Sequence, residues 1–180
     1  MHDDLQRLLA KDLLPDVTAV PLEDLRNLRV ECSEAEGDVS FVRRVAQGRL
    51  DIVGHEVRRR AGATDAAPAD TGLLFDLPDI LTLGASSNSP GGGRMLAIHE
   101  PGVLAQALMA SLDAAASPSE LTALGRLGDD RLQALLESLR SFEVDLSTHR
   151  RRLHERIDSI QGEIARRYRD GEASIDSLLN

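Results

Sequence analysis

EGDVSFVRRVAQGRLD at residues 36–51 and EVDLSTHRRRLHERID at residues 143–158 carry the same polar pattern. The first stretch reads Glu-x3-Ser-x2-Arg-x3-Gln-x3-Asp, and the second has identical spacing with His in place of Gln. Every position of the second copy lies 107 residues after its counterpart in the first. The pattern consists of Glu36, Ser40, Arg43, Gln47 and Asp51 in the first copy and of Glu143, Ser147, Arg150, His154 and Asp158 in the second.

Both copies lie within long stretches that have the apolar spacing of a coiled coil. Residues 22–61 and 129–169 contain no Pro, and their apolar residues recur at alternating spacings of three and four, which is typical of a coiled-coil seam. Gly37, Gly48 and Gly54 weaken the first helix by roughly 1 kcal/mol each relative to Ala. The seam positions are Leu25, Leu28, Cys32, Ala35, Val39, Val42, Ala46 and Val53 in the first stretch and Leu135, Leu139, Phe142, Leu146, Leu153 and Ile160 in the second, with Arg49, His149 and Arg156 in remaining slots.

The repeat preserves the phase of the seam as well as the polar residues. Val39 matches Leu146, and Val53 matches Ile160, at the same offset. At about 100° per residue, the five polar side chains of each copy fall within a sector of roughly 80° beside the seam. We call these two sectors the polar ribbons. Four further Arg residues match at the same offset and are expected to support the ribbons: Arg44, Arg49, Arg151 and Arg156.

These patterns predict an all-α fold, in which two long helices form an antiparallel coiled coil with short accessory helices and a mobile insert. Residues 3–14 have leucines on one side, residues 63–101 have a linker composition, and Ser117 with Glu120 predicts a helix start. The predicted segments are an N-terminal arm (1–15), the first coiled-coil helix (22–62), a flexible insert (63–101), short accessory helices (102–128), the second coiled-coil helix (129–170) and a C-terminal tail (171–180).

Composition argues against several functional classes. The net charge of −9 would repel a nucleic-acid backbone, so direct DNA binding through the clustered Arg residues is a weaker alternative. The single Cys32 excludes an internal disulfide, and His149 and His154 lie five residues apart, which does not align metal ligands on one helix face. No nucleophile elbow is present, so neither a metal site nor an enzyme is expected. The acidic start and the lack of a long apolar run predict a cytoplasmic protein without membrane contact.

The chemistry of the ribbons suits a guanine nucleotide. Arg can donate two hydrogen bonds to guanine O6 and N7, or contact a phosphate. A carboxylate can accept hydrogen bonds from guanine N1–H and N2–H, Gln can serve either edge, and Ser can donate to a phosphate oxygen. Equivalent ribbons related by a pseudo-twofold axis would present matching groups to a twofold ligand. The alternative for a single ribbon is a solvated face with local ion pairs, such as Glu36 with Arg43 or Arg44.

The duplicated pattern resembles the cyclic di-GMP signature of the RsiG family of actinobacterial anti-sigma factors. The resemblance covers residues 22–61 and about 130–170; the first copy matches in full, and the second departs at His154. It implies that all ten pattern residues bind cyclic di-GMP, held as a dimer of the nucleotide. It also implies that the loaded protein sequesters a WhiG-type sporulation sigma factor and so represses its transcription programme.

Two points stay open at the level of sequence. A structural coiled-coil adaptor without a nucleotide ligand is the alternative function, and it predicts that substitutions in the ribbons barely change partner binding. The surface that contacts a sigma factor is not fixed either. Its candidates are the N-terminal arm and a second apolar edge that includes Leu50, Val57, Ile157 and Ile164.

Overall fold

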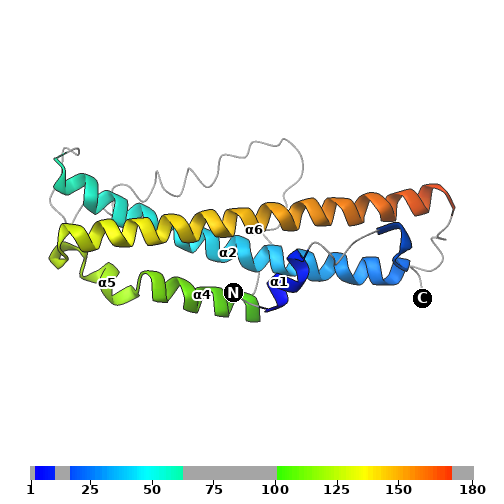
Figure 1. Cartoon of the computed structure of the whole chain (residues 1–180), viewed down its shortest axis with the longest axis horizontal. Coiled ribbons are helices and arrows are strands. Elements are labelled where there is room, and N and C mark those ends of the chain that lie inside the picture. Colours follow the sequence, from blue (N-terminus) through cyan, green and yellow to red (C-terminus); the bar gives the residue numbers. More distant parts are fainter. Residues whose placement is uncertain (1–2, 11–16, 63–100, 172–180) are drawn as a thin grey trace, which may run out of the picture.

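The computed structural model describes residues 3–10, 17–62 and 101–171, and the described elements are all helical (Figure 1). The predicted mobile insert lies almost entirely outside the described residues, as does most of the predicted C-terminal tail. The elements in chain order are α1 (Asp3–Leu9), the 3-10 helix η2 (Val17–Ala19), α2 (Leu22–Arg60), α4 (Val103–Ala115), α5 (Pro118–Thr122), the 3-10 helix η3 (Leu124–Arg126) and α6 (Asp129–Arg169).

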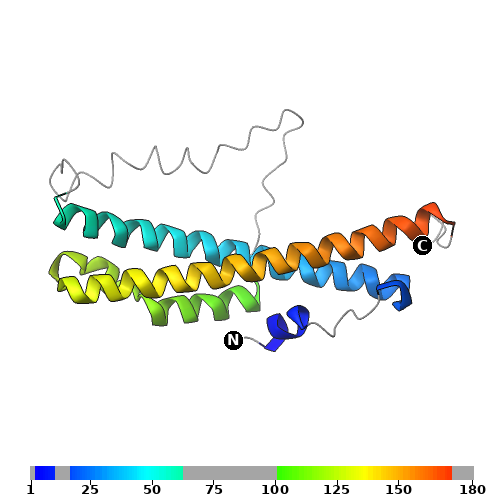
Figure 2. The same cartoon turned by 45° about the horizontal axis from the view of Figure 1, so that its top comes forward.

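The two long helices, α2 and α6, pack against each other along much of their length (Figures 1 and 2). They run antiparallel, because Glu36 lies opposite Arg150 whereas Arg43, further along α2, lies opposite the earlier Glu143. The predicted antiparallel coiled coil is therefore confirmed. Its seam is buried at Leu25, Cys32, Ala35, Val39, Val42, Ala46 and Val53 of α2 and at Leu135, Leu139, Leu146, Leu153 and Ile160 of α6.

Helix α2 is continuous despite its three glycines. Burial of an apolar side chain such as Val39 or Val42, both fully buried, contributes about 1.5–3 kcal/mol. Several such side chains outweigh a cost of roughly 1 kcal/mol per Gly. Gly54 is itself buried, and a Cβ added there would lie 3.3 Å from the Arg58 guanidinium.

The accessory helices α1 and α4 lie on the same side of the long pair (Figures 1 and 2). Leu5 and Leu8 of α1 and Leu108 and Leu112 of α4 are buried, and they join the seam residues in one apolar core. The helix predicted over residues 3–14 ends at Leu9, and residues 11–14 lie outside the described part of the chain. The helix start predicted at Ser117 is confirmed by a capping box with Glu120.

The internal repeat extends beyond the long helices. The 3-10 helix η2 precedes α2 and η3 precedes α6, and the starts of both 3-10 helices and both long helices are 107 residues apart. Each half of the chain therefore contains an accessory helix, a 3-10 turn and a long helix in that order, and the second half has the short helix α5 in addition. This larger unit was not predicted, because a single 3-10 turn leaves no periodic signal in the sequence.

Candidate functional site

The two polar ribbons meet across the α2–α6 pair. Arg150 Nε donates to Glu36 Oε1 and to Ser40 Oγ, with both distances 2.9 Å. Ser40 in turn donates to Glu36 Oε1 at 2.6 Å, and His154 Nε2 lies 3.1 Å from the same oxygen. The Glu36 carboxylate thus contacts one side chain from its own helix and two side chains from the facing helix.

Glu143 makes the corresponding contacts from the other helix. Arg43 Nη1 donates to Glu143 Oε1 at 2.9 Å, and Gln47 Nε2 donates to it at 3.1 Å. Ser147, on the same helix as Glu143, donates to it at 2.9 Å. The His154 of the second copy therefore occupies the position relative to Glu36 that Gln47 occupies relative to Glu143.

These contacts define a pseudo-twofold axis through the centre of the pair. Adding 107 to Glu36 and subtracting 107 from Arg150 turns one cross-helix ion pair into the other, Arg43 with Glu143. Both ribbons must then lie on the same face, around the point where the axis emerges. Among the described residues, Glu36 does not form the local ion pairs considered for an isolated ribbon, and its Arg partner, Arg150, lies on the facing helix instead.

Both central glutamates are held in the charged form. Partial burial on its own raises the pKa of the Glu36 carboxyl, but hydrogen bonds from Ser40 and Arg150, with the charge of His154, lower the pKa further than burial raises it. The pKa of Glu143 is lowered in the same way, since Ser147, Arg43 and Gln47 together outweigh its burial. The centre of the site is thus a symmetric arrangement of carboxylate and guanidinium groups.

A family model with the description RsiG-like matches residues 11–81 and 118–180, which is more than half of the chain. The chain belongs to the RsiG-like family. This is a family of anti-sigma regulators and not of enzymes. No curated protein matches the chain. The resemblance drawn from the duplicated pattern is therefore confirmed at the level of the family.

The last residue of each ribbon, Asp51 or Asp158, is not engaged by the described part of the chain. Asp51 and Asp158 are exposed, and neither makes a hydrogen bond or ion pair with the described residues. Arg43 Nε is buried and has no hydrogen-bond partner among these residues, which is costly unless another group satisfies it. The two free carboxylates offer hydrogen-bond acceptors to a polar ligand.

Two of the four Arg residues expected to support the ribbons bind the accessory helices. Arg49 reaches α4, donating to the Ala116 carbonyl at 2.8 Å and to Asp113 at 2.6 Å. Its counterpart Arg156 reaches the end of α1, where it donates to the carbonyls of Leu8 and Ala10. Each of these Arg residues anchors an accessory helix. The other two, Arg44 and Arg151, are exposed and make no ion pair with the described residues.

A second pair of matched clusters holds the ends of the long helices. Glu56 binds Arg59 and Arg60 at the end of α2, and Arg60 donates to the carbonyls of Leu124 and Leu127 at 2.9 and 2.8 Å. We call this group the first end clamp. The sequence match of Glu56, Arg59 and Arg60 to Glu163, Arg166 and Arg167 signals it, although the role of these residues was not predicted.

The second end clamp, at the end of α6, has the same construction. Glu163 binds Arg166 and Arg167, and Arg167 donates to the carbonyls of Val17 and Thr18 at 3.1 and 2.9 Å. Each long helix therefore holds the 3-10 turn that leads into the other. Hydrogen bonds from the paired Arg residues lower the pKa of both Glu56 and Glu163 to about 2.

Asp38 is a buried carboxylate that sequence reasoning missed. It accepts hydrogen bonds from the backbone N–H groups of Gly102 at 2.9 Å and Ala105 at 3.1 Å, and so caps the start of α4. A Cβ at position 102 would lie 2.7 Å from Asp38 Oδ2, so the close approach requires Gly. The cap lies 64 residues from Gly102, and no local pattern reveals it.

None of the helices in the described part of the chain is long and apolar enough to cross a membrane. The same residues contain no group of three or more His, Cys, Asp or Glu side chains that could hold a metal ion.

Proposed function

We propose that this chain is a cyclic di-GMP-responsive anti-sigma factor that sequesters a WhiG-type sporulation sigma factor and so represses its transcription programme. One observation carries the proposal: the two copies of the polar pattern face each other around a single pseudo-twofold axis. Cyclic di-GMP has two guanines and two phosphates related by a twofold axis, so a matched pair of ribbons can recognise both halves of it.

The chemistry of each ribbon residue suggests its part. Arg43 and Arg150 would pair with guanine O6 and N7 or with a phosphate. Asp51 and Asp158 would accept from guanine N1–H and N2–H, the donors that distinguish guanine from adenine. When bound, the nucleotide supplies planar base edges and two negative charges.

Ligand binding would compete with the ion pairs that link the helices. The Arg43–Glu143 and Arg150–Glu36 pairs are partly exposed, and such pairs contribute only about 0.2–1 kcal/mol. A bidentate contact from Arg to guanine favours guanine over another base by about 1–3 kcal/mol. In this exchange Glu36 and Glu143 would be freed to hold ribbon side chains from their own helices in place.

Isothermal titration calorimetry with cyclic di-GMP tests the proposal. Arg43→Ala and Asp51→Ala should each weaken binding by about 1–3 kcal/mol, and Arg150→Ala and Asp158→Ala should act similarly from the second copy. Glu34→Ala is the control, because this exposed residue of α2 lies outside the ribbon and makes no hydrogen bond or ion pair with the described residues. A wild-type protein that releases no heat and gains no thermal stability with cyclic di-GMP would contradict the nucleotide role.

A structural coiled-coil adaptor is the second candidate, and one observation favours it. Four ribbon residues already engage one another in cross-helix ion pairs, so the ribbons strengthen the pair without any ligand. In that case Arg43→Ala would lower the melting temperature and leave the affinity for the sigma factor unchanged, both with and without cyclic di-GMP. A pull-down with the purified sigma factor, repeated for wild type and variant, separates the two candidates.

A further inference from the structure

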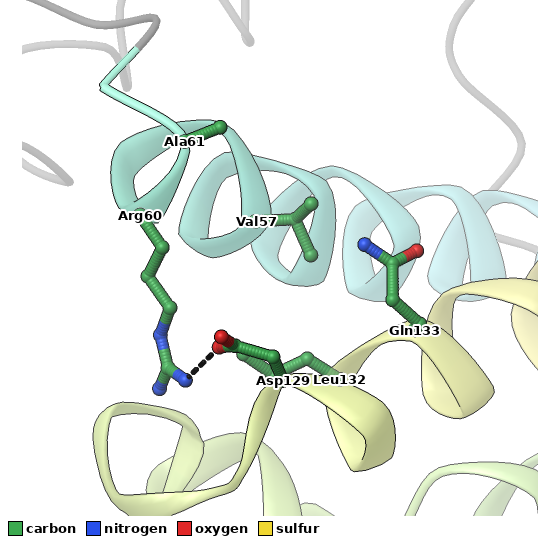
Figure 3. Close-up of a pocket in the computed structure, with 6 residues that line it drawn as sticks. All are labelled: Val57, Arg60, Ala61, Asp129, Leu132 and Gln133. Carbon is green, nitrogen blue, oxygen red and sulfur yellow. Dashed lines mark hydrogen bonds and ion pairs between the residues drawn. The ribbon is translucent and has the colours of Figure 1, made fainter.

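The described residues leave a cavity of about 220 Å³ where α2 ends and α6 begins (Figure 3). Leu132 forms an apolar part of its wall and is almost fully buried. Arg60 crosses one side, held in place by Glu56 and Asp129. The cavity is lined by Val57, Arg60, Ala61, Asp129, Leu132 and Gln133.

The opposite end of the pair shows what occupies the equivalent position. The offset of 107 relates Ala61 to Tyr168 and relates Gln133 to Arg26. Tyr168 Oη accepts a hydrogen bond from Arg26 Nη2, and the Arg26 guanidinium carbon lies 5.9 Å from the centroid of the Tyr168 ring. At one end an aromatic ring therefore packs beside the seam, and at the other end the small Ala61 leaves the equivalent space open.

The size and chemistry of the cavity suit the same kind of ring. The cavity is open to solvent on one side, and its volume of about 220 Å³ exceeds the roughly 150 Å³ of a closed cavity that holds a benzene ring. Gln133 makes no hydrogen bond with the described residues, and its amide can meet a phenol hydroxyl where Arg26 meets that of Tyr168. The anchored Arg60 supplies a fixed polar edge beside the apolar surface of Val57 and Leu132.

We propose that this cavity receives a tyrosine side chain of a partner protein, in the position that Tyr168 takes at the other end. Buried aromatic anchors are frequent hot spots of protein interfaces. The partner that the proposed function implies, the sigma factor, would supply this tyrosine.

The variant Ala61→Tyr tests the proposal, because it supplies the ring from within the chain. It should raise the melting temperature, lower the affinity for the sigma factor at least tenfold and leave the affinity for cyclic di-GMP unchanged. Ala165→Tyr is the control, since it places a tyrosine at an exposed position near the other end of α6. An Ala61→Tyr protein that binds the sigma factor as tightly as wild type would overturn the proposal.

Titration with p-cresol examines the cavity independently of the sigma factor. In ¹⁵N-labelled wild type, p-cresol should shift the amide signals of Ala61, Leu132 and Gln133, and these shifts should vanish in Ala61→Tyr. The identity of the partner rests on the proposed function. If wild type binds no sigma factor, the proposed function fails. Binding of p-cresol at the cavity would still support an aromatic site there, and the absence of p-cresol binding would overturn that site. Self-association abolished by Ala61→Tyr would identify a second copy as the occupant and overturn the proposal of a different partner.

Discussion

The two halves of the chain agree at the centre and differ at the edges. Around the pseudo-twofold axis, the contacts of Glu36 repeat at Glu143 almost group for group. Away from the axis, Asp38 caps α4, whereas its counterpart Asp145 is exposed and caps nothing in the described chain. The contacts around the axis therefore preserve the twofold symmetry of the helix pair. Contacts made by only one copy, such as the Asp38 cap, do not follow that symmetry.

The largest effect on stability is expected from a substitution that makes the two halves of the seam alike. Leu153 and its counterpart Ala46 are both fully buried, so Leu153→Ala would give both halves the same small residue. This change should lower the free energy of unfolding by about 2–5 kcal/mol, since it removes buried methyl groups and leaves a cavity. Urea unfolding followed by circular dichroism measures it. Val144→Ala, at an exposed position of the same helix, should change stability by no more than about 0.5 kcal/mol; equal effects of the two variants would contradict the packing of this layer.

An intermediate effect is expected at the cap that only one half has. Asp38→Ala leaves the N–H groups of Gly102 and Ala105 without their acceptor, and the cost should be about 1–3 kcal/mol in the free energy of unfolding. Asp145→Ala is the matched control in the other half, with an expected change within about 0.5 kcal/mol. Hydrogen exchange at Ala105 should accelerate only in the first variant. Unchanged exchange there would show that α4 does not depend on the cap.

The smallest effect should come from the end clamps, where the halves agree. The pKa of Glu163 is about 2 in the fold against an ordinary value of 4.5. A carboxylate whose pKa is lowered by folding stabilises the fold above its unfolded pKa, and this contribution is lost as the pH falls from about 4.5 to 2. Glu163→Gln should therefore flatten the decline in stability across that range, and Glu56→Gln should do the same from the first half.

Thermal unfolding measured at several pH values between 2 and 6 checks this expectation. Glu155→Gln serves as the control, because Glu155 is exposed and makes no ion pair with the described residues. If only one of the two clamp variants flattens the curve, the end clamps are not equivalent. If neither does, their ion pairs do not persist in solution.

The long helices were predictable because a coiled-coil seam repeats along the chain. The same alternating spacing that indicates a helix also indicates which face of it is buried, so the seam followed from Val39, Leu146 and their neighbours. The ribbons were predictable as sets of residues, although the ligand assigned to them stays a prediction. The cross-helix direction of the Glu36 ion pairs was not, because Arg43 lies seven residues, or about two turns, further along the same helix face and the sequence alone offers it as a partner.

Contacts between distant segments left no local signal. Arg49 and Arg156 occupy seam slots in the sequence, yet in the fold their long side chains reach the ends of α4 and α1. An extended Arg can leave the face on which its Cα lies, so heptad position alone did not predict its partner. The open cavity beside Ala61 depends on a missing side chain, which can be recognised only by comparison with Tyr168.

Because both long helices belong to one chain, their association is a first-order process. Dilution does not separate α2 from α6, whereas a coiled coil of two chains dissociates as the protein concentration falls. A pair of identical helices must also accept every substitution twice. Here Tyr168 stands at one end and Ala61 at the other, so a single chain can keep a symmetric centre while each end acquires a chemistry of its own.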